Sequence, residues 1–470
     1  MKRLTSNSLR FIPVALGLAV GLLANNALAQ SQYFGVTAGI ANAGTYSWDA
    51  ANWGAAAAGP FTSTWTPGDF ARFYGGASDN YTVTVNASEA NTGLYLNAAN
   101  ATLNINDAGS GTGSLNFQTA IQGILVGGSY TENLYINVPI TGNGGIAPEL
   151  SGSVYLGAAN TYTAGTALGD SGNTLTYFNN NNAFSSGGIT LNRTGIANFS
   201  TLLSYGGAPI TLANNFSATA SVGTGTGLNF ASGVNAPVTS SGTWTLGTYN
   251  LNLRSSGGST APLKISGAIS GSGILALSAN GTGSKHILSG ANPFTGTIIV
   301  AGNATASPTY GGNAAATLVL GAANTIANAS QLQMAGGTVD PGGFHHTMTA
   351  TTLSLSASST FDYTSGAAEM DFADSSSATW TPGTTLNLVS TGGGNWNTSG
   401  DELNFAQNPI GLDGVRLGQI EFNGADLGDA GIDDNGFIYD TVQPIPEPST
   451  LVLGLLGGLG LLWNARRRTA

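Results

Sequence analysis

The sequence predicts an all-β protein, a right-handed parallel β-helix in which short coils stack into a solenoid. Three observations lead to this prediction. Short runs of alternating apolar and polar residues recur along the chain, as in strands with one buried face. Clusters of Gly, Asn, Asp and Ser, which favour tight turns, separate these runs. One segment recurs in three copies, which indicates repeated structural units.

The alternating runs define the expected strands. Helical periodicity is nearly absent between the two ends of the chain, so we expect almost no helix in the body. Between about residues 75 and 400 we expect parallel strand neighbours to outnumber antiparallel ones. The clearest alternating runs are residues 81–85, 94–96, 103–105, 251–253 and 353–355.

The repeated segment begins with a leucine and carries an asparagine four positions later. Its copies are LGAANTYT from Leu156, LSGANPFT from Leu288 and LGAANTI from Leu320. A single coil cannot bury its own apolar face, so these leucines should point inward and stack on neighbouring coils. We expect the asparagines to sit at corners in the left-handed conformation and to form amide ladders between coils.

Residues 265–325 resemble the autotransporter-associated β-strand repeats, the passenger-type repeats of secreted β-helices. The matching stretches are 271–277, 289–296 and 317–321, with a weaker match over 152–168. The resemblance implies a β-helix, which we place at 76–400. An autotransporter would end in a translocating β-barrel, whereas this chain ends in a single hydrophobic segment and arginines, so we expect another export route.

The body has a distinct segment at each end of the predicted β-helix. Residues 30–75 are rich in aromatics, including Trp48 and Trp53, and are expected to cap the first coil. The alternative is that Trp48 and Trp53 stack against sugar rings. Residues 401–443 are acidic and are expected to form the last coils or a terminal cap.

The first 29 residues have the pattern of a secretory signal peptide. Lys2, Arg3 and Arg10 precede an apolar stretch at 11–23, and Ala27 and Ala29 form a small-x-small cleavage site. We expect the Sec translocon to export the chain and a peptidase to cut it after Ala29. An uncleaved signal anchor is the alternative.

The last 27 residues, 444–470, combine a short polar motif, an apolar segment at 451–463 and a basic stop. The apolar segment is shorter than the roughly 20 residues of a comfortable bilayer span, and the arginines should stay cytoplasmic. The alternative is an ordinary C-terminal anchor helix after a Pro-rich linker. The motif is Pro446, Glu447 and Pro448, and the stop is Arg466, Arg467 and Arg468.

This order of features resembles the PEP-CTERM sorting signal of exported proteins in Gram-negative-type bacteria. The resemblance implies that an exosortase, a membrane protease or transpeptidase, recognises Pro446, Glu447 and Pro448. It also implies an inner-membrane intermediate, followed by release to the cell surface or the extracellular matrix. The resemblance covers only the tail.

Composition excludes several classes of function. Without both terminal signals, six basic residues face 22 acidic ones, a net charge of −16. Nucleic-acid binding needs clustered Lys and Arg, so we expect none. The chain has 70 glycines and no cysteine, which excludes disulfides and thiol chemistry. Its hydrophobic content of 41% argues against intrinsic disorder. Fourteen of the acidic residues lie from Asp340 onward. We interpret them as a solvated acidic end; the alternative is a weak surface site for divalent cations.

The histidines do not indicate a metal site. His286 lies beside a strand, whereas His345 and His346 follow a Gly-rich turn and are expected in a surface loop. Adjacent residues on a strand face opposite ways, and we find no carboxylate at a spacing that would complete a zinc site. We therefore expect no metal and no cofactor.

One carboxylate pair remains as a candidate for catalysis. Glu369 and Asp371 alternate within one predicted strand and would share a face, as an acid–base pair or a cation site. Lyases acting on anionic sugars also need a basic residue, and none lies near this segment. The stretch 426–435 has EF-hand-like letters in the wrong register, so we interpret it as an acidic turn.

The sequence therefore favours a non-enzymatic, exported structural β-helix of the cell surface or extracellular matrix, associated with biofilm or exopolysaccharide. The alternative is a surface polysaccharide-active enzyme, or a carbohydrate-binding or adhesin module, on the same scaffold. A lateral cleft with a carboxylate pair and a Lys or Arg would favour the enzyme.

Overall fold

The structure is a computed structural model. It describes residues 30–35, 43–74, 79–97, 100–118, 121–127, 131–168, 175–192, 200–220, 228–232, 236–256, 261–307, 309–390, 400–405, 411–424 and 430–441. The predicted signal peptide, the sorting motif, the apolar segment 451–463 and the terminal arginines lie outside the described residues. No helix among the described residues is long and apolar enough to cross a membrane.

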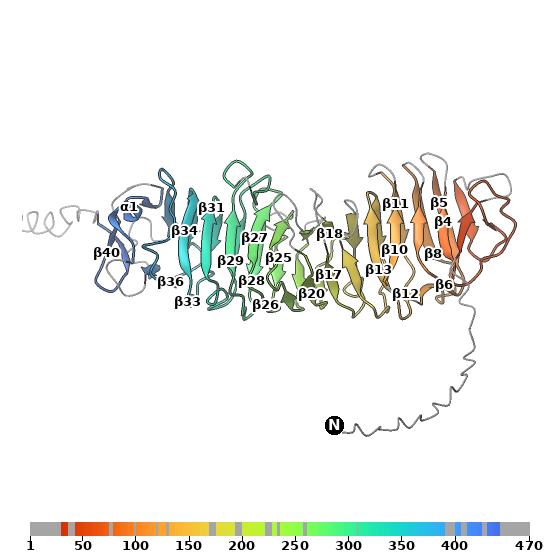
Figure 1. The fold of residues 1–470 in the computed structure, drawn as a ribbon, viewed down its shortest axis with the longest axis horizontal. Helices are drawn as coiled ribbons and strands as arrows, with labels where there is room; N and C mark the ends of the chain where they lie inside the picture. The colour runs from red at the N-terminus through yellow and green to blue at the C-terminus, as the bar shows by residue number, and fades with distance from the viewer. Residues whose placement is uncertain are drawn as a thin grey trace, which may run out of the picture.

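The described chain is all-β and elongated, with its strands lying across the long axis (Figure 1). Its N-terminal strands lie at one end of the rod and its C-terminal strands at the other. The largest sheet has 13 strands. Its order is β2 (Gly44–Ser47), β5 (Asn80–Val85), β8 (Thr102–Asp107), β11 (Asn133–Ile136), β14 (Ser153–Leu156), β16 (Leu175–Phe178), β18 (Ser200–Ser204), β21 (Leu228–Ser232), β24 (Leu251–Ser255), β27 (Ile274–Ala279), β29 (Thr297–Ala301), β31 (Gln331–Ala335) and β34 (Thr352–Ala357).

A second long sheet runs over the N-terminal half of the rod and has 11 strands. Its order is β26 (Ile269–Ser270), β23 (Trp244–Thr245), β20 (Phe216–Ala218), β17 (Ile189–Leu191), β15 (Thr166–Leu168), β13 (Gly145–Leu150), β10 (Ile121–Val126), β7 (Leu94–Leu96), β4 (Phe70–Phe73), β1 (Ser31–Phe34) and β3 (Trp53–Gly54).

A third sheet of nine strands covers the C-terminal half. Its order is β19 (Ile210–Leu212), β22 (Val238–Ser240), β25 (Leu263–Ile265), β28 (Lys285–Leu288), β30 (Thr317–Leu320), β32 (Thr338–Asp340), β35 (Ser359–Asp362), β37 (Leu386–Val389) and β39 (Ile420–Phe422).

The remaining elements are short. Two small sheets contain β12 (Ile140–Thr141), β9 (Ser114–Phe117) and β6 (Ser88–Asn91), and β33 (His345–Met348), β36 (Glu369–Phe372) and β38 (Glu402–Phe405). A hairpin of β40 (Ala430–Ile432) and β41 (Ile438–Asp440) and the one-turn helix α1 (Gly414–Leu417) lie near the C-terminal end.

Strand pairing follows the predicted pattern of stacked coils. Ile146 pairs with Thr166, and Thr166 pairs with Ile189, so the chain returns to the same sheet one coil later. Between named strands of the described part, only β1 with β3 and β40 with β41 pair antiparallel. The expected excess of parallel pairs is confirmed, and the long parallel sheets are compatible with a β-helix or solenoid.

One hydrophobic core runs along the rod, from Phe34 to Ile438. The alternating runs place every second side chain in it, because successive residues of a strand face opposite sides. Leu156, Leu288 and Leu320 are all buried there. Their predicted inward orientation is confirmed.

The asparagines of the repeats join coils in a different way from the one predicted. Asn292 Oδ1 accepts a hydrogen bond from the backbone N–H of Ile269 at 2.7 Å, and its Nδ2 donates to the carbonyl of Thr325. Asn160 makes the same kind of bonds on both sides. Only Asn324 has a positive φ, 58°. The prediction of left-handed corners and amide ladders is therefore wrong for Asn160 and Asn292, because buried backbone groups need these amides as partners.

Glycines at one corner allow the coils to stack closely. A Cβ on Gly267 would overlap the carbonyl oxygen of Gly242 in the preceding coil, and a Cβ on Gly290 would overlap that of Gly267. The backbones approach so closely here that no side chain fits between them. The high glycine content thus reflects backbone contact between coils as well as turn formation.

Candidate functional site

His345 and His346 lie on strand β33, which corrects their predicted place in a surface loop. They face opposite ways, as expected for neighbours on a strand. His346 is fully buried, where its Nε2 donates to the carbonyl of Pro341 at 2.9 Å and its Nδ1 accepts from the backbone N–H of Asn324 at 3.1 Å. Burial lowers the pKa of His346, so its role is to hold the turn as a neutral ring.

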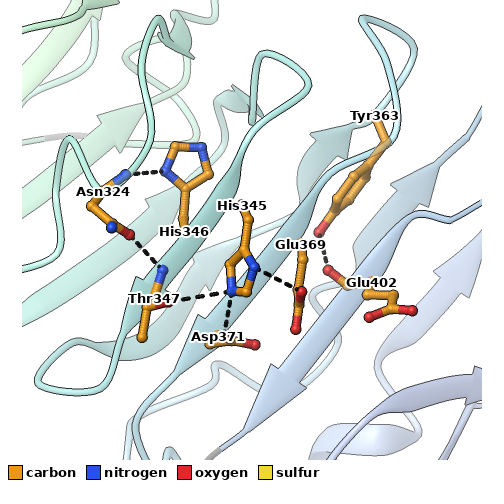
Figure 2. Close-up of polar contacts among 8 residues, drawn as sticks. All are labelled: Asn324, His345, His346, Thr347, Tyr363, Glu369, Asp371 and Glu402. Atoms are coloured by element: carbon orange, nitrogen blue, oxygen red, sulfur yellow. Dashed lines mark hydrogen bonds and ion pairs between the residues drawn. The ribbon is translucent and has the colours of Figure 1, made fainter.

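His345 points outward and contacts two carboxylates on the next strand, β36 (Figure 2). Its Nδ1 lies 3.0 Å from Oε2 of Glu369, and its Nε2 lies 2.8 Å from Oδ2 of Asp371. The His345 side chain is 53% exposed, whereas those of Glu369 and Asp371 are 24% and 19% exposed. The two carboxylates are therefore more buried than the ring that they contact.

Parallel pairing brings these three residues together. His345 pairs with Glu369, and Thr347 pairs with Asp371, one coil further along the chain. The sequence indicated no carboxylate at a spacing that would complete a metal site with His345. That interpretation is wrong, because in stacked coils the nearest outward neighbours belong to the next coil.

The charges of this cluster interact strongly. Burial, followed by a hydrogen bond to Asp371 and the charge of Asp371, raises the pKa of Glu369 to about 7. The hydrogen bond to Asp371 is the main cause that raises the pKa of His345 above its usual value, against a smaller effect of burial. Two close carboxylates thus favour a proton or another cation between them.

The chemistry open to Glu369 and Asp371 is limited by His345. Both ring nitrogens contact carboxylate oxygens, so the predicted acid–base pair is already engaged in ion pairs. The charged groups that act on Glu369 among the described residues are Asp371, His345 and Glu402, with no Lys or Arg. The arrangement is suited to holding a cation, since the ligand atoms of His345, Glu369 and Asp371 lie within 4.8 Å of one another.

His286 lies on strand β28, and its side chain is buried in the interior of the rod. It takes no part in the His345 cluster. It is fully buried, and its Nε2 donates to the carbonyl of Ser278 at 2.8 Å. Its Nδ1 is buried without a hydrogen-bond partner among the described residues. Burial lowers the pKa of His286 to about 4. It is a neutral core histidine.

Trp48 and Trp53 are fully buried, which leaves neither ring open to a sugar. They pack against each other with ring centroids 5.0 Å apart, and both contact Trp65 and Phe73. This burial excludes glycan stacking, which was the alternative for Trp48 and Trp53. Their rings belong to the hydrophobic core of the first coils.

A different aromatic group, which the sequence analysis missed, is partly exposed near the same end. Arg72 lies on β4 between Tyr33 of β1 and Tyr95 of β7, with which it pairs in register. Its Cζ is 5.8 Å from the ring centroid of Tyr33 and 5.3 Å from those of Phe70 and Tyr95. Tyr74 completes this group of half-buried side chains, which we call the Arg72 patch. The available signal in the sequence was the alternating strand β4, in which Arg72 stands between aromatic residues.

No family model matches the chain, and neither a curated protein nor a solved structure matches it.

Proposed function

We propose that this chain is an exported, non-enzymatic right-handed parallel β-helix that becomes a structural component of the cell surface or extracellular matrix. The observation that carries the proposal is the large hydrophobic core that runs through the described residues from Phe34 to Ile438. A rod whose core grows coil by coil gains length and lateral surface, which suits a spacer or scaffold. The engagement of Glu369 and Asp371 with His345 also supports a role without catalysis.

Export and sorting complete the proposal. The resemblance of residues 446–470 to the PEP-CTERM signal supports an inner-membrane intermediate that an exosortase processes at Pro446, Glu447 and Pro448. The apolar segment 451–463 is short for a permanent span, and Arg466 to Arg468 would halt its transfer. The strongly acidic body fits a partner such as a neutral exopolysaccharide better than an anionic polymer.

Replacement of Glu447 by Ala tests the sorting step. In the native host we expect this variant to accumulate in the inner membrane, whereas the wild-type protein reaches the cell surface. Cell fractionation with an antibody against the β body measures the distribution. The same change at Glu421, a half-buried carboxylate on β39, is the control and should leave sorting unchanged. Surface delivery of the Glu447→Ala variant at the wild-type level would contradict the proposal.

The Arg72 patch favours a second candidate function, a carbohydrate-binding or adhesin module on the same scaffold. Aromatic rings stack on sugar rings, and the guanidinium of Arg72 offers donors to sugar hydroxyls. Its Nε already donates to the hydroxyl of Ser31 at 2.8 Å, which holds the group in place.

Binding to exopolysaccharide from the native host tests this second function. We expect Tyr95→Ala to weaken binding in affinity electrophoresis by about fivefold, since one aromatic contact contributes on the order of 1 kcal/mol. Tyr439→Ala, at an exposed tyrosine on β41, is the matched control. Equal mobility shifts for both variants and the wild type would rule the patch out as a glycan site.

A further inference from the structure

The outward face of three neighbouring strands near the C-terminal end carries an ordered grid of polar side chains. Strands β33, β36 and β38 pair in parallel and in register. Their alternate residues Met370, Phe372 and Leu403 belong to the core, so the residues between them point away from it. The grid has His345, Glu369 and Glu402 in one row, and Thr347, Asp371 and Asn404 in the other.

Two acceptor atoms in this grid lack a donor. Oδ1 of Asp371 and Oδ1 of Asn404 are both buried without a hydrogen-bond partner among the described residues. Asn404 is only 6% exposed. The two residues are direct neighbours on β36 and β38. Buried acceptors without donors need an explanation, and an ion or water that satisfies them is a common one.

The ligand types in the grid select a class of ion. Ca²⁺ and Mg²⁺ prefer oxygen ligands only, whereas an imidazole ligand suits Zn²⁺ and other first-row transition metals, which also accept carboxylate oxygens. We propose that this grid binds a divalent transition-metal ion of the Zn²⁺ class through His345, Glu369 and Asp371. Their ligand atoms lie within 4.8 Å of one another, so small shifts of the side chains would let one ion contact all three.

The charge around the site supports this assignment. Glu369, Asp371 and Glu402 are three carboxyl groups on adjacent strands, and His345 is the partner of two of them. A divalent ion would neutralise this surplus of negative charge and could add Glu402 as a further oxygen ligand. The ion would tie β33 to β36, and therefore one coil to the next. This inference goes beyond the proposed structural role and does not depend on sorting or on glycan binding.

Isothermal titration with ZnCl₂ tests the proposal on chelator-treated protein, produced from the full-length gene without a polyhistidine tag. We expect one binding site and a melting temperature that rises with Zn²⁺. His345→Gln and Asp371→Asn should each weaken the affinity by about tenfold or more, since even indirect partners of a metal contribute that much. Glu421→Gln, which removes an equal charge from another sheet, should bind like the wild type.

Substitution with Co²⁺ provides an independent readout, because its visible absorption depends on coordination by His345. We expect the absorption in the wild type and its loss in His345→Gln. Circular dichroism checks that each variant folds, and Glu369→Gln replaces any variant that does not. The proposal is overturned if the wild type shows neither Zn²⁺ heat nor a Co²⁺ spectrum, or if the variants bind Zn²⁺ as tightly as the wild type. Ca²⁺ binding that His345→Gln leaves unchanged, without Zn²⁺ binding, would show an oxygen-only site and also overturn it.

Discussion

Three histidines of this chain lie in three different environments, and only their surroundings distinguish them. His345 is exposed between two carboxylates, His346 is buried with both nitrogens bonded, and His286 is buried with one nitrogen bonded. The strand neighbours of His286 are Leu263 and Leu318. The apolar coils on both sides of His286 disfavour the charged form of its ring. His286 is therefore the residue whose protonation should most affect folding.

The stability of the rod should fall as the pH falls below about 6.5, because of His286. Its pKa is about 4 when folded and about 6.5 when unfolded. Above pH 6.5 the His286 ring is neutral in both the folded and the unfolded state, so it does not change the unfolding free energy. Between pH 6.5 and 4 the unfolded state takes up the proton first, which costs about 3 kcal/mol in all. Urea unfolding midpoints at pH 7.5 and 4.5 measure the loss.

His286→Gln is the control for this pH dependence. Glutamine can keep a donor for the carbonyl of Ser278 but does not titrate. Acidic residues also contribute to the pH dependence, and they do so equally in both proteins. The wild type should therefore lose more stability than His286→Gln over this interval. Parallel losses in the two proteins would mean that His286 does not carry the effect.

At the scale of one element, the corner glycines set how closely two coils can pack. Gly267 has the carbonyl of Gly242 against the position of its missing Cβ. Gly267→Ala must push the two backbones apart and weaken the hydrogen bonds of the adjoining strands. Gly414, at the start of α1, has open space at the same position and is the matched control.

Thermal melts should separate these two glycines. We expect Gly267→Ala to lower the unfolding free energy by roughly 1–3 kcal/mol, in the range of other overpacked sites. Gly414→Ala should be neutral or slightly stabilising, because alanine favours a helix more than glycine does. The packing account fails if both variants melt at the wild-type temperature.

The sequence predicted individual strands better than the contacts between strands of neighbouring coils. Alternation placed Tyr81, Val83 and Val85 of β5 correctly in the core, because a strand's period is a local property. The contacts between residues of neighbouring coils depend on the strand register. Insertions in the loops change this register. For this reason the contact between His345 and Asp371 was missed, although both residues had been considered separately. Trp48 and Trp53 were expected to cap the first coil, with sugar stacking as the alternative, and their burial excludes that alternative.

At the scale of the whole molecule, the protein is a rod with chemically different ends. Buried tryptophans fill the first coils and the Arg72 patch lies over them, whereas the acidic grid lies near the last coils. Each coil depends on its neighbours for burial, so damage should spread from one coil to the next. A rod of this kind is suited to display its two ends at a distance from each other.

We propose that the rod reaches the cell surface after its C-terminal signal is removed. Mass spectrometry of the C-terminus of the surface-located protein from the native host tests it most directly. The account predicts a last residue near Pro446, Glu447 or Pro448, with segment 451–463 absent. A mature surface protein that still carries Arg466, Arg467 and Arg468 would contradict the account and leave a simple membrane-anchored β protein.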